Sequence, residues 1–210
     1  MQRIGLLGGM FDPVHNGHLR IAVECQYTLS LDQLRMLPCA APAHREMPGV
    51  SPQWRLKMLQ AALHNVEGII ADDRELKRPA PSYTIDTLRA VKAEFPQASL
   101  YLIIGSDAFQ SLNTWHEWRS LLSLTNIVIA RRPDHRPDCL SEVGKLLADA
   151  FVTNLPSFLK SNAGKICVIN VCQLEISSSC IRALLNERKS VQFLLPDSVI
   201  KLIQEHHLYP

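Results

Sequence analysis

The sequence predicts an α/β protein with a doubly wound, mainly parallel sheet. Short apolar segments alternate with segments of helical periodicity along almost the whole chain, which is the pattern of a parallel sheet covered by helices on both faces. The 210 residues are 47% hydrophobic and 20% charged, as is usual for a globular protein. This length suits one well-buried domain over residues 1–210, with a small helical part at about 177–210.

The predicted strands are short apolar runs bounded by glycine, proline or polar residues. The run Ile4-Gly5-Leu6-Leu7 is closed by glycines, as expected of a buried parallel strand. An apolar run at residues 100–104, among the longest in the chain, is far too short to span a bilayer, so we expect no membrane segment. The predicted strands cover residues 3–7, 34–38, 68–71, 100–105, 126–130 and 166–171.

Helical periodicity fills the intervals between these strands. The segment 17–29 carries an apolar stripe, and either Asp12-Pro13 or Asn16 can cap its start. Two stretches rich in proline, alanine and polar residues, 38–52 and 77–82, follow predicted strands and are candidate walls or lids of a ligand site. The predicted helices cover residues 17–29, 52–63, 84–94, 115–122, 178–186 and 197–205, with weaker periodicity over 140–150.

Charge and cysteine content narrow the class of protein. A net charge of +2 is too small to indicate a nucleic-acid partner. The six cysteines form no Cys-x-x-Cys pair, which predicts free thiols rather than a zinc site or a disulfide framework. The chain reaches its first strand by Ile4 without a basic leader or a long apolar core, so we expect no signal peptide and a cytoplasmic location.

The segment GGMFDPVHNGH, residues 8–18, places two histidines three residues apart where a strand gives way to a helix. His15 and His18 then share a face in the first turn, where unpaired backbone N–H groups and the helix dipole favour anions such as phosphate. The same positive end discourages imidazolium, so we expect the rings to act as neutral hydrogen-bond donors. A solvated helix face is the alternative, but glycines flank the pair on both sides and permit close approach of a ligand.

Other common phosphate and metal motifs are excluded. No Gly-x-Gly-x-x-Gly follows the first predicted strand, so the dinucleotide fingerprint is absent. Gly164-Lys165 is followed by isoleucine rather than by serine or threonine, which excludes a Walker-type phosphate loop. A histidine pair at this spacing without a nearby cysteine or glutamate is also a poor zinc signature.

A second segment, ISSSCIR at residues 176–182, again follows a predicted strand and opens a helix. Its hydroxyls and free N–H groups would converge there, with Arg182 one turn into the helix. An arginine at that position opposes the helix dipole, which indicates that an anion compensates it. For this segment alone, a simple serine cap is the alternative interpretation.

The pairing of these two motifs resembles the nucleotidyltransferase superfamily that carries an HxGH motif and an ISSTxxR motif. Within it, the chain is similar over essentially its whole length to the bacterial nicotinate-nucleotide adenylyltransferases. The ordered set is highly specific, although any one segment alone would be weak. It consists of residues 8–18, 42–45 (PAHR), 81–84 (PSYT), 104–107 (IGSD), 115–116 (WH), 131–133 (RRP) and 176–182.

The resemblance implies a Rossmann-like nucleotidyltransferase domain over residues 1–210. The implied reaction, a step of NAD biosynthesis, transfers AMP from ATP to nicotinate mononucleotide and forms nicotinate adenine dinucleotide and pyrophosphate. The implied cofactor is Mg²⁺, held mainly by the ATP phosphates and water, which accounts for the lack of an acidic cluster in the sequence. No nucleic acid or membrane is implied as a partner, and the resemblance leaves both a monomer and a homo-oligomer open.

The resemblance also implies roles for individual residues. His15, His18 and Arg182 match catalytic positions, with His18 the better match for contact with the α-phosphate. No side chain matches a metal ligand. The implied ATP-binding residues are Gly8, Gly9, Met10, Phe11, His15, His18, Gly105, Asp107, Arg132, Ser178, Ser179 and Arg182, and the implied nicotinate mononucleotide-binding residues are His44, Arg45, Tyr83, Thr84 and Trp115.

Some of these residues depart from the family pattern or have a simpler interpretation. Met10 stands where the family usually has serine or threonine, and Ala43 replaces a common proline. Trp115 is equally compatible with a core position, and Asp107 with a helix cap. From composition alone, the pair His44-Arg45 fits a solvated loop as well as a ligand contact.

Two other functions stay open. A related enzyme acting on nicotinamide mononucleotide or phosphopantetheine would keep both motifs, and Trp115 and Thr84 are the positions that discriminate it. A module that binds nucleotide without turnover is favoured only by Met10 and Ala43. A fragment of an aminoacyl-tRNA synthetase is excluded, because the chain lacks the lysine-rich late motif and the anticodon domain that it would need.

Overall fold

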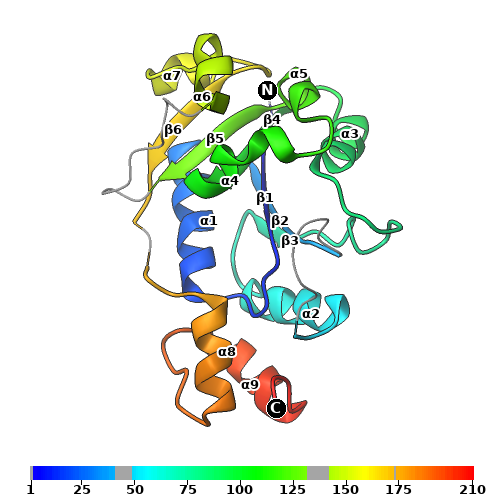
Figure 1. Ribbon diagram of the computed structural model, residues 1–210, viewed down its shortest axis with the longest axis vertical. Coiled ribbons are helices and arrows are strands. Elements are labelled where there is room, and N and C mark those ends of the chain that lie inside the picture. Colours follow the sequence, from blue (N-terminus) through cyan, green and yellow to red (C-terminus); the bar gives the residue numbers. More distant parts are fainter. Residues whose placement is uncertain (1, 41–48, 132–141, 173) are drawn as a thin grey trace.

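The computed structural model describes residues 2–40, 49–131, 142–172 and 174–210, and its centre is a six-stranded sheet. The strands are β1 (Arg3–Gly9), β2 (Gln33–Pro38), β3 (Ile69–Ala71), β4 (Ser99–Gly105), β5 (Asn126–Arg131) and β6 (Ile166–Asn170). All neighbouring strands of this sheet pair in parallel, in the order β3-β2-β1-β4-β5-β6 (Figure 1). The order reverses between β1 and β4, and ligands of doubly wound sheets bind at the carboxyl ends of the strands beside such a point.

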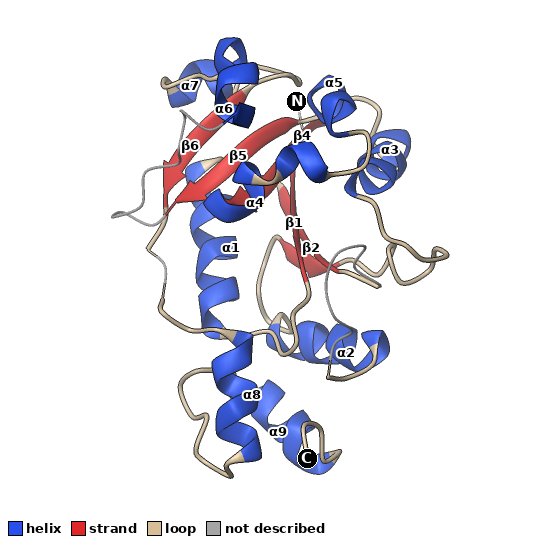
Figure 2. Cartoon of the chain, in the orientation of Figure 1, coloured by secondary structure: helices blue, strands red, loops and turns tan. Residues whose placement is uncertain are grey.

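The helices connect successive strands or follow the last one (Figure 2). The α-helices are α1 (Asn16–Thr28), α2 (Pro52–Ala62), α3 (Thr84–Glu94), α4 (Ser106–Gln110), α5 (Leu121–Leu124), α6 (Glu142–Leu146), α7 (Leu155–Phe158), α8 (Ser178–Asn186) and α9 (Asp197–Glu205). The described residues also form short 3₁₀ turns, which are η1 (Leu112–Thr114), η2 (Trp118–Ser120) and η3 (Ala148–Ala150).

Two hydrophobic clusters cover the two faces of the sheet. Successive side chains of β4 alternate between them, with Leu100 and Leu102 in one cluster and Tyr101 and Ile103 in the other. The first pair packs with residues of α3, α4, α5 and α6, and the second with residues of α1, α2 and α7. Burial on both faces explains why β4 is a nearly continuous apolar run, as the sequence predicted.

The predicted doubly wound α/β fold is confirmed, and each predicted strand matches an observed one to within two residues at either end. Most long helices also lie where the periodicity placed them. The short helices α4 and α7 were not predicted, because helices of four or five residues carry too few turns to show periodicity. The weak stretch 140–150 contains α6 and η3, while residues 140 and 141 lie outside the described part of the chain.

The helix predicted over 115–122 is wrong in its first three residues, while η2 and the start of α5 cover residues 118–122. Trp115 follows η1 with extended backbone, and Glu117 adopts the left-handed conformation with φ of 48° before η2 begins. Trp115 and Trp118 both pack against the cluster on the α3 face, so their helical spacing reflects shared burial rather than a helix. Here tertiary packing overrides the local pattern.

The helices α8 and α9 lie beyond the sheet (Figures 1 and 2). Helix α8 lies near the amino end of α1, and α9 packs against α2, where Ser198 donates to the carbonyl of Ala61. The loop between α8 and α9 is bonded to α1, since the backbone N–H of Asn16 donates to the carbonyl of Leu194 at 2.9 Å and its side chain donates to that of Phe193 at 2.8 Å. Neither helix is long or apolar enough to cross a bilayer, and the same holds for every other helix that the structure describes.

Candidate active site

The β1–α1 turn begins at the carboxyl end of β1 and ends in a reciprocal histidine cap. His15 is the N-cap residue of α1, and its Nδ1 accepts a hydrogen bond from the backbone N–H of His18 at 3.4 Å. The Nδ1 of His18 in turn accepts from the backbone N–H of His15 at 3.3 Å. The expectation that Asp12-Pro13 or Asn16 caps this helix is therefore wrong, because the histidine rings themselves satisfy the first N–H groups.

This arrangement fixes the proton positions of both rings. In neutral imidazole one nitrogen donates and the other accepts, so accepting at Nδ1 leaves the proton on Nε2. The rings stack with centroids 3.7 Å apart. Burial lowers the pKa of His15 to about 4, and burial together with the charge of His15 lowers the pKa of His18 to about 3. The rings are thus neutral Nε2–H donors, as the sequence predicted, although burial rather than the helix dipole is the main cause.

Glycines make room for these rings. A Cβ on Gly17 would lie 3.0 Å from Nδ1 and 3.1 Å from Cε1 of His15, closer than side chains ordinarily approach. A Cβ on Gly9 would lie 2.9 Å from the ring of Phe11, whose backbone is left-handed with φ of 49° and whose ring meets His18 edge-on at 5.0 Å. The glycines of this turn are therefore required by the position of the aromatic rings.

Two other glycines border open space at the switch point of the sheet. Gly8 and Gly105 lie at the carboxyl ends of β1 and β4, and a Cβ on either would meet no described atom within 4 Å. Gly105 is also the N-cap residue of α4, which places Asp107 in the exposed first turn rather than at the cap. The structure therefore leaves room for a ligand beside the strand ends that a doubly wound sheet uses for binding.

Helix α8 joins the second motif to the histidine turn. Ser177 caps α8 by accepting from the backbone N–H of Cys180, and the hydroxyl of Ser178 donates to the carbonyl of Pro13 at 3.0 Å. Arg182 donates from Nη1 to the carbonyl of Asp12 at 2.7 Å. Two segments more than 160 residues apart in sequence thus meet at one place, with Ser179 exposed beside them.

Arg55 of α2 supports the same turn, and no sequence pattern singled it out. It is fully buried in α2 and donates to the carbonyl of Met10 at 2.7 Å and to that of Cys39 at 2.6 Å. Met10 therefore contributes its backbone carbonyl to this network. The only available signal was an arginine within the predicted helix 52–63, and an arginine exposed to solvent would look the same in the sequence.

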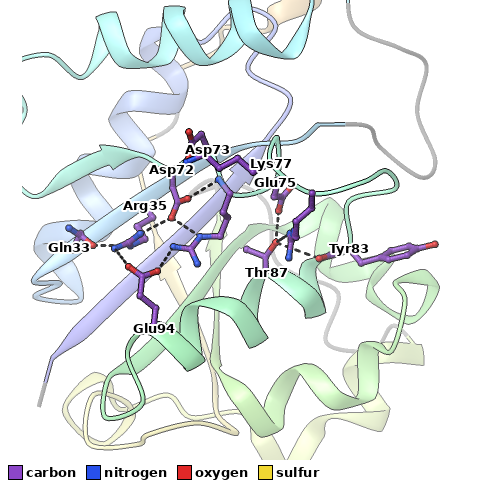
Figure 3. Close-up of polar contacts among 11 residues, drawn as sticks. Gln33, Arg35, Asp72, Asp73, Glu75, Lys77, Tyr83, Thr87 and Glu94 are labelled. Carbon is purple, nitrogen blue, oxygen red and sulfur yellow. Dashed lines mark hydrogen bonds and ion pairs between the residues drawn. The ribbon is translucent and has the colours of Figure 1, made fainter.

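A second group of predicted residues lies at the amino end of α3. Tyr83 is the N-cap residue and Thr84 the first residue of this helix. The buried Glu75 accepts a hydrogen bond from Oγ1 of Thr87 at 2.8 Å (Figure 3). The backbone N–H of Thr87 donates to the carbonyl of Tyr83. Burial raises the pKa of Glu75. The carboxyl group thus braces the first turn of α3 from inside.

Trp115 lies next to that turn. The ring of Tyr83 contacts the ring of His116 with centroids 4.3 Å apart, and Arg89 of α3 forms two hydrogen bonds with Glu117, of 3.1 and 2.6 Å. Trp115 is half-buried and packs against the same hydrophobic cluster as Tyr83. The structure therefore brings Trp115, Tyr83 and Thr84 together, and half-burial leaves part of the indole ring available to a ligand.

The remaining predicted site residues, His44, Arg45 and Arg132, lie outside the described residues. Arg132 directly follows β5, and the segment 41–48 lies between β2 and α2. Within the described ranges, no group of three or more histidine, cysteine, aspartate or glutamate side chains is arranged to hold a metal ion.

Comparison with known proteins gives the class of the chain. Residues 6–184 match the family model described as Cytidylyltransferase-like. Fold and paired motifs thus define a nucleotidyltransferase. A relative from Pseudomonas syringae pv. tomato is 47% identical over 209 residues, covering 99% of this chain and 94% of its own, and one from Methylococcus capsulatus is 44% identical over 207 residues, covering 98% and 99%. Both carry the name nicotinate-nucleotide adenylyltransferase, and the chain belongs to this family.

Solved structures agree on the fold. The nicotinic acid mononucleotide adenylyltransferase of Plasmodium falciparum complexed with NaAD superposes with a TM-score of 0.74 at 21% identity, covering 100% of this chain and 98% of that one. A nicotinate-nucleotide adenylyltransferase from Vibrio parahaemolyticus gives a TM-score of 0.66 at 16% identity, covering 100% and 96%. At these identities the likeness establishes the fold alone.

Proposed function

We propose that the chain transfers AMP from ATP to the phosphate of nicotinate mononucleotide, forming nicotinate adenine dinucleotide and pyrophosphate. The names of its relatives at 44–47% identity support this reaction. The observation that carries the proposal is the pair of neutral histidines, whose Nδ1 atoms are both occupied by backbone N–H groups and whose Nε2–H groups remain as donors. These donors lie at the turn to which Ser178 and Arg182 are bonded.

The reaction needs alignment more than it needs a base. A phosphate oxygen of nicotinate mononucleotide attacks the α-phosphorus of ATP, the new P–O bond forms, and the bond from the α-phosphorus to the bridging oxygen breaks to release pyrophosphate. The attacking oxygen is already anionic, so no proton has to be removed. His15 and His18 donate to the phosphate oxygens on which charge develops, and they stay neutral throughout.

The serine and arginine motif holds the departing half of the nucleotide. Ser178, Ser179 and Arg182 would bind the β- and γ-phosphates, and the fixed positive charge of Arg182 stabilises the leaving pyrophosphate. Gly8, Gly9, Met10, Phe11, Gly105, Asp107 and Arg132 would line the rest of the ATP site. Because Arg182 and Tyr209 each donate a hydrogen bond to Asp12, we propose that residues 1–210 act as one nucleotidyltransferase domain.

We assign the metal to the nucleotide rather than to the protein. Asp12, the carboxylate at the junction of the two motifs, is already bonded to Tyr209 and Gly49, which fits a Mg²⁺ ion that arrives on the triphosphate with phosphate and water ligands. Bound there, the ion neutralises part of the phosphate charge. Since the substrates are soluble nucleotides, we also propose a cytoplasmic location.

The acceptor would bind between Trp115 and the amino end of α3. The indole ring stacks on the pyridine, and the first backbone N–H groups of α3 at Thr84 receive the nicotinate carboxylate. Such a site disfavours the neutral amide of nicotinamide mononucleotide, because the charge that the helix end stabilises is then missing. Tyr83, His44 and Arg45 would complete the wall on the mononucleotide side.

The test is release of pyrophosphate from ATP and Mg²⁺ with nicotinate mononucleotide, with nicotinamide mononucleotide, or with no acceptor. We expect fast release with the acid, slower release with the amide and none without an acceptor. Binding of ATP without release in any arm would support a nucleotide-binding module instead. Preference for the amide would identify a sibling enzyme with a different acceptor.

A further inference from the structure

The carboxylate of Asp12 is the meeting point of three parts of the chain. It is 4% exposed, and its Oδ1 accepts a hydrogen bond of 2.6 Å from the hydroxyl of Tyr209. Its Oδ2 accepts one of 2.8 Å from the backbone N–H of Gly49 and lies 3.7 Å from Nη1 of Arg182. A buried carboxylate with this many fixed partners has little freedom to rotate.

Tyr209 is held in place as a donor to this carboxylate. Burial, followed by the hydrogen bond to Asp12 and its charge, raises the pKa of the Tyr209 phenol, so its hydroxyl keeps its proton. Its backbone is left-handed with φ of 60°, a conformation that costs a tyrosine free energy and persists only where surrounding contacts impose it. Tyr209 is thus held against Asp12 by its surroundings.

Arg182 is the group that this arrangement orients. The same Nη1 atom that faces Oδ2 of Asp12 donates to the Asp12 carbonyl at 2.7 Å, so the residue holds the guanidinium through both its backbone and its side chain. A guanidinium has five N–H donors, and fixing one of them directs the others. A Cβ on Gly49 would lie 3.5 Å from the Tyr209 ring and 3.7 Å from Cδ of Arg182, which shows how closely these residues pack.

We propose that Tyr209 is a positioning residue for Arg182 and acts through Asp12. Its hydroxyl locks the Asp12 carboxylate, and the locked residue presents the Arg182 guanidinium to the triphosphate with its orientation already set. This inference rests on the proposed function, because it takes the β- and γ-phosphates of ATP as the ligand of Arg182. A residue that follows α9 thereby becomes part of the phosphate site.

The experiment compares Tyr209→Phe with wild type in the pyrophosphate-release assay, with ATP and nicotinate mononucleotide varied separately. Losing one hydrogen bond to a charged group should raise the KM for ATP by about three- to tenfold and leave the KM for nicotinate mononucleotide unchanged. The same substitution is then made in an Arg182→Ala background, where it should have no further effect on ATP. Tyr101→Phe, which removes the hydroxyl of a fully buried tyrosine that donates to the Leu159 carbonyl, should leave both KM values unchanged.

Three results would overturn the inference. These are an unchanged KM for ATP in Tyr209→Phe, an equal rise for both substrates, and the same fold-effect with and without Arg182. If Tyr209→Phe unfolds at too low a temperature to be assayed, Asp12→Asn is the second variant. An unchanged KM for ATP in Asp12→Asn also counts against the inference. A wild-type protein that releases no pyrophosphate refutes the proposed function instead, so the two failures are distinguishable.

Discussion

His15 and His18 each accept a backbone hydrogen bond from the other residue, with both bonds made at Nδ1. One arrangement therefore does two things. It caps the first turn of α1, and it commits the opposite nitrogen of each ring to donating outward. The predictions that follow depend on this pairing and on its connection to α8.

Lowering the pH should destabilise the protein through these two histidines. Their pKa values fall from 6.5 to about 4 and about 3, so between these limits the unfolded chain binds protons that the folded chain does not. The stability that depends on these two histidines is thus fully present above about pH 6.5, and it declines as the pH falls. Urea midpoints at about pH 7 and about pH 5.5 should differ less for His18→Asn than for wild type. A control, exposed His64→Asn, should keep the wild-type difference, and equal differences in all three proteins would contradict the assignment.

Gly17→Ala should lower activity more than stability. The added Cβ would press on Nδ1 and Cε1 of His15 at 3.0 and 3.1 Å and turn the ring away from its cap position. Because small misplacements of a catalytic group are costly, we expect kcat to fall by about tenfold or more, with a modest loss of Tm. Measurement of kcat and of thermal unfolding on the same preparation checks this. Normal kcat would show that the ring position is not critical.

Gly8→Ala and Gly105→Ala should leave the stability of the protein unchanged but weaken the binding of ATP. Neither new Cβ meets a described atom within 4 Å, and neither glycine has a positive φ, so Tm should be unchanged. We expect the KM for ATP to rise by about tenfold if this space belongs to the nucleotide. A fall in Tm with an unchanged KM would mean that the glycines serve folding alone.

Trp115→Ala should act on the acceptor. Stacking made equally in the ground state and the transition state affects KM without kcat, so the KM for nicotinate mononucleotide should rise by about tenfold at unchanged kcat. Trp118→Ala is the matched control, because Trp118 packs on the same cluster; it should lower Tm without raising that KM. A large loss of kcat at saturating acceptor in Trp115→Ala would contradict this division of roles.

The sequence predicted the sheet and the long helices because burial on one or both faces imposes periods that can be read from residues alone. It failed at 115–122, where Trp115 and Trp118 share a buried cluster without sharing a helix. Periodicity records which residues are buried, and only the three-dimensional structure shows how the backbone reaches them.

The sequence predicted the polar motifs of the candidate site but not the residues that hold these motifs in place. His15, His18 and Arg182 stand in spacings that indicate phosphate binding. Asp12 was noticed only as a helix cap, and Arg55 and Tyr209 not at all, because their roles depend on contacts with residues far away in the chain. Long-range hydrogen bonds leave no local pattern, so a buried arginine in a helix looks like a solvated one.

The most direct test compares wild type with His18→Ala in formation of nicotinate adenine dinucleotide and pyrophosphate at saturating ATP and nicotinate mononucleotide. Wild type should form the two products in equal amounts. The variant should be slower by about two to three orders of magnitude, as when one transition-state donor is removed, while His64→Ala stays at the wild-type rate. Near-normal turnover in His18→Ala would contradict the account and reduce the histidine pair to a structural turn.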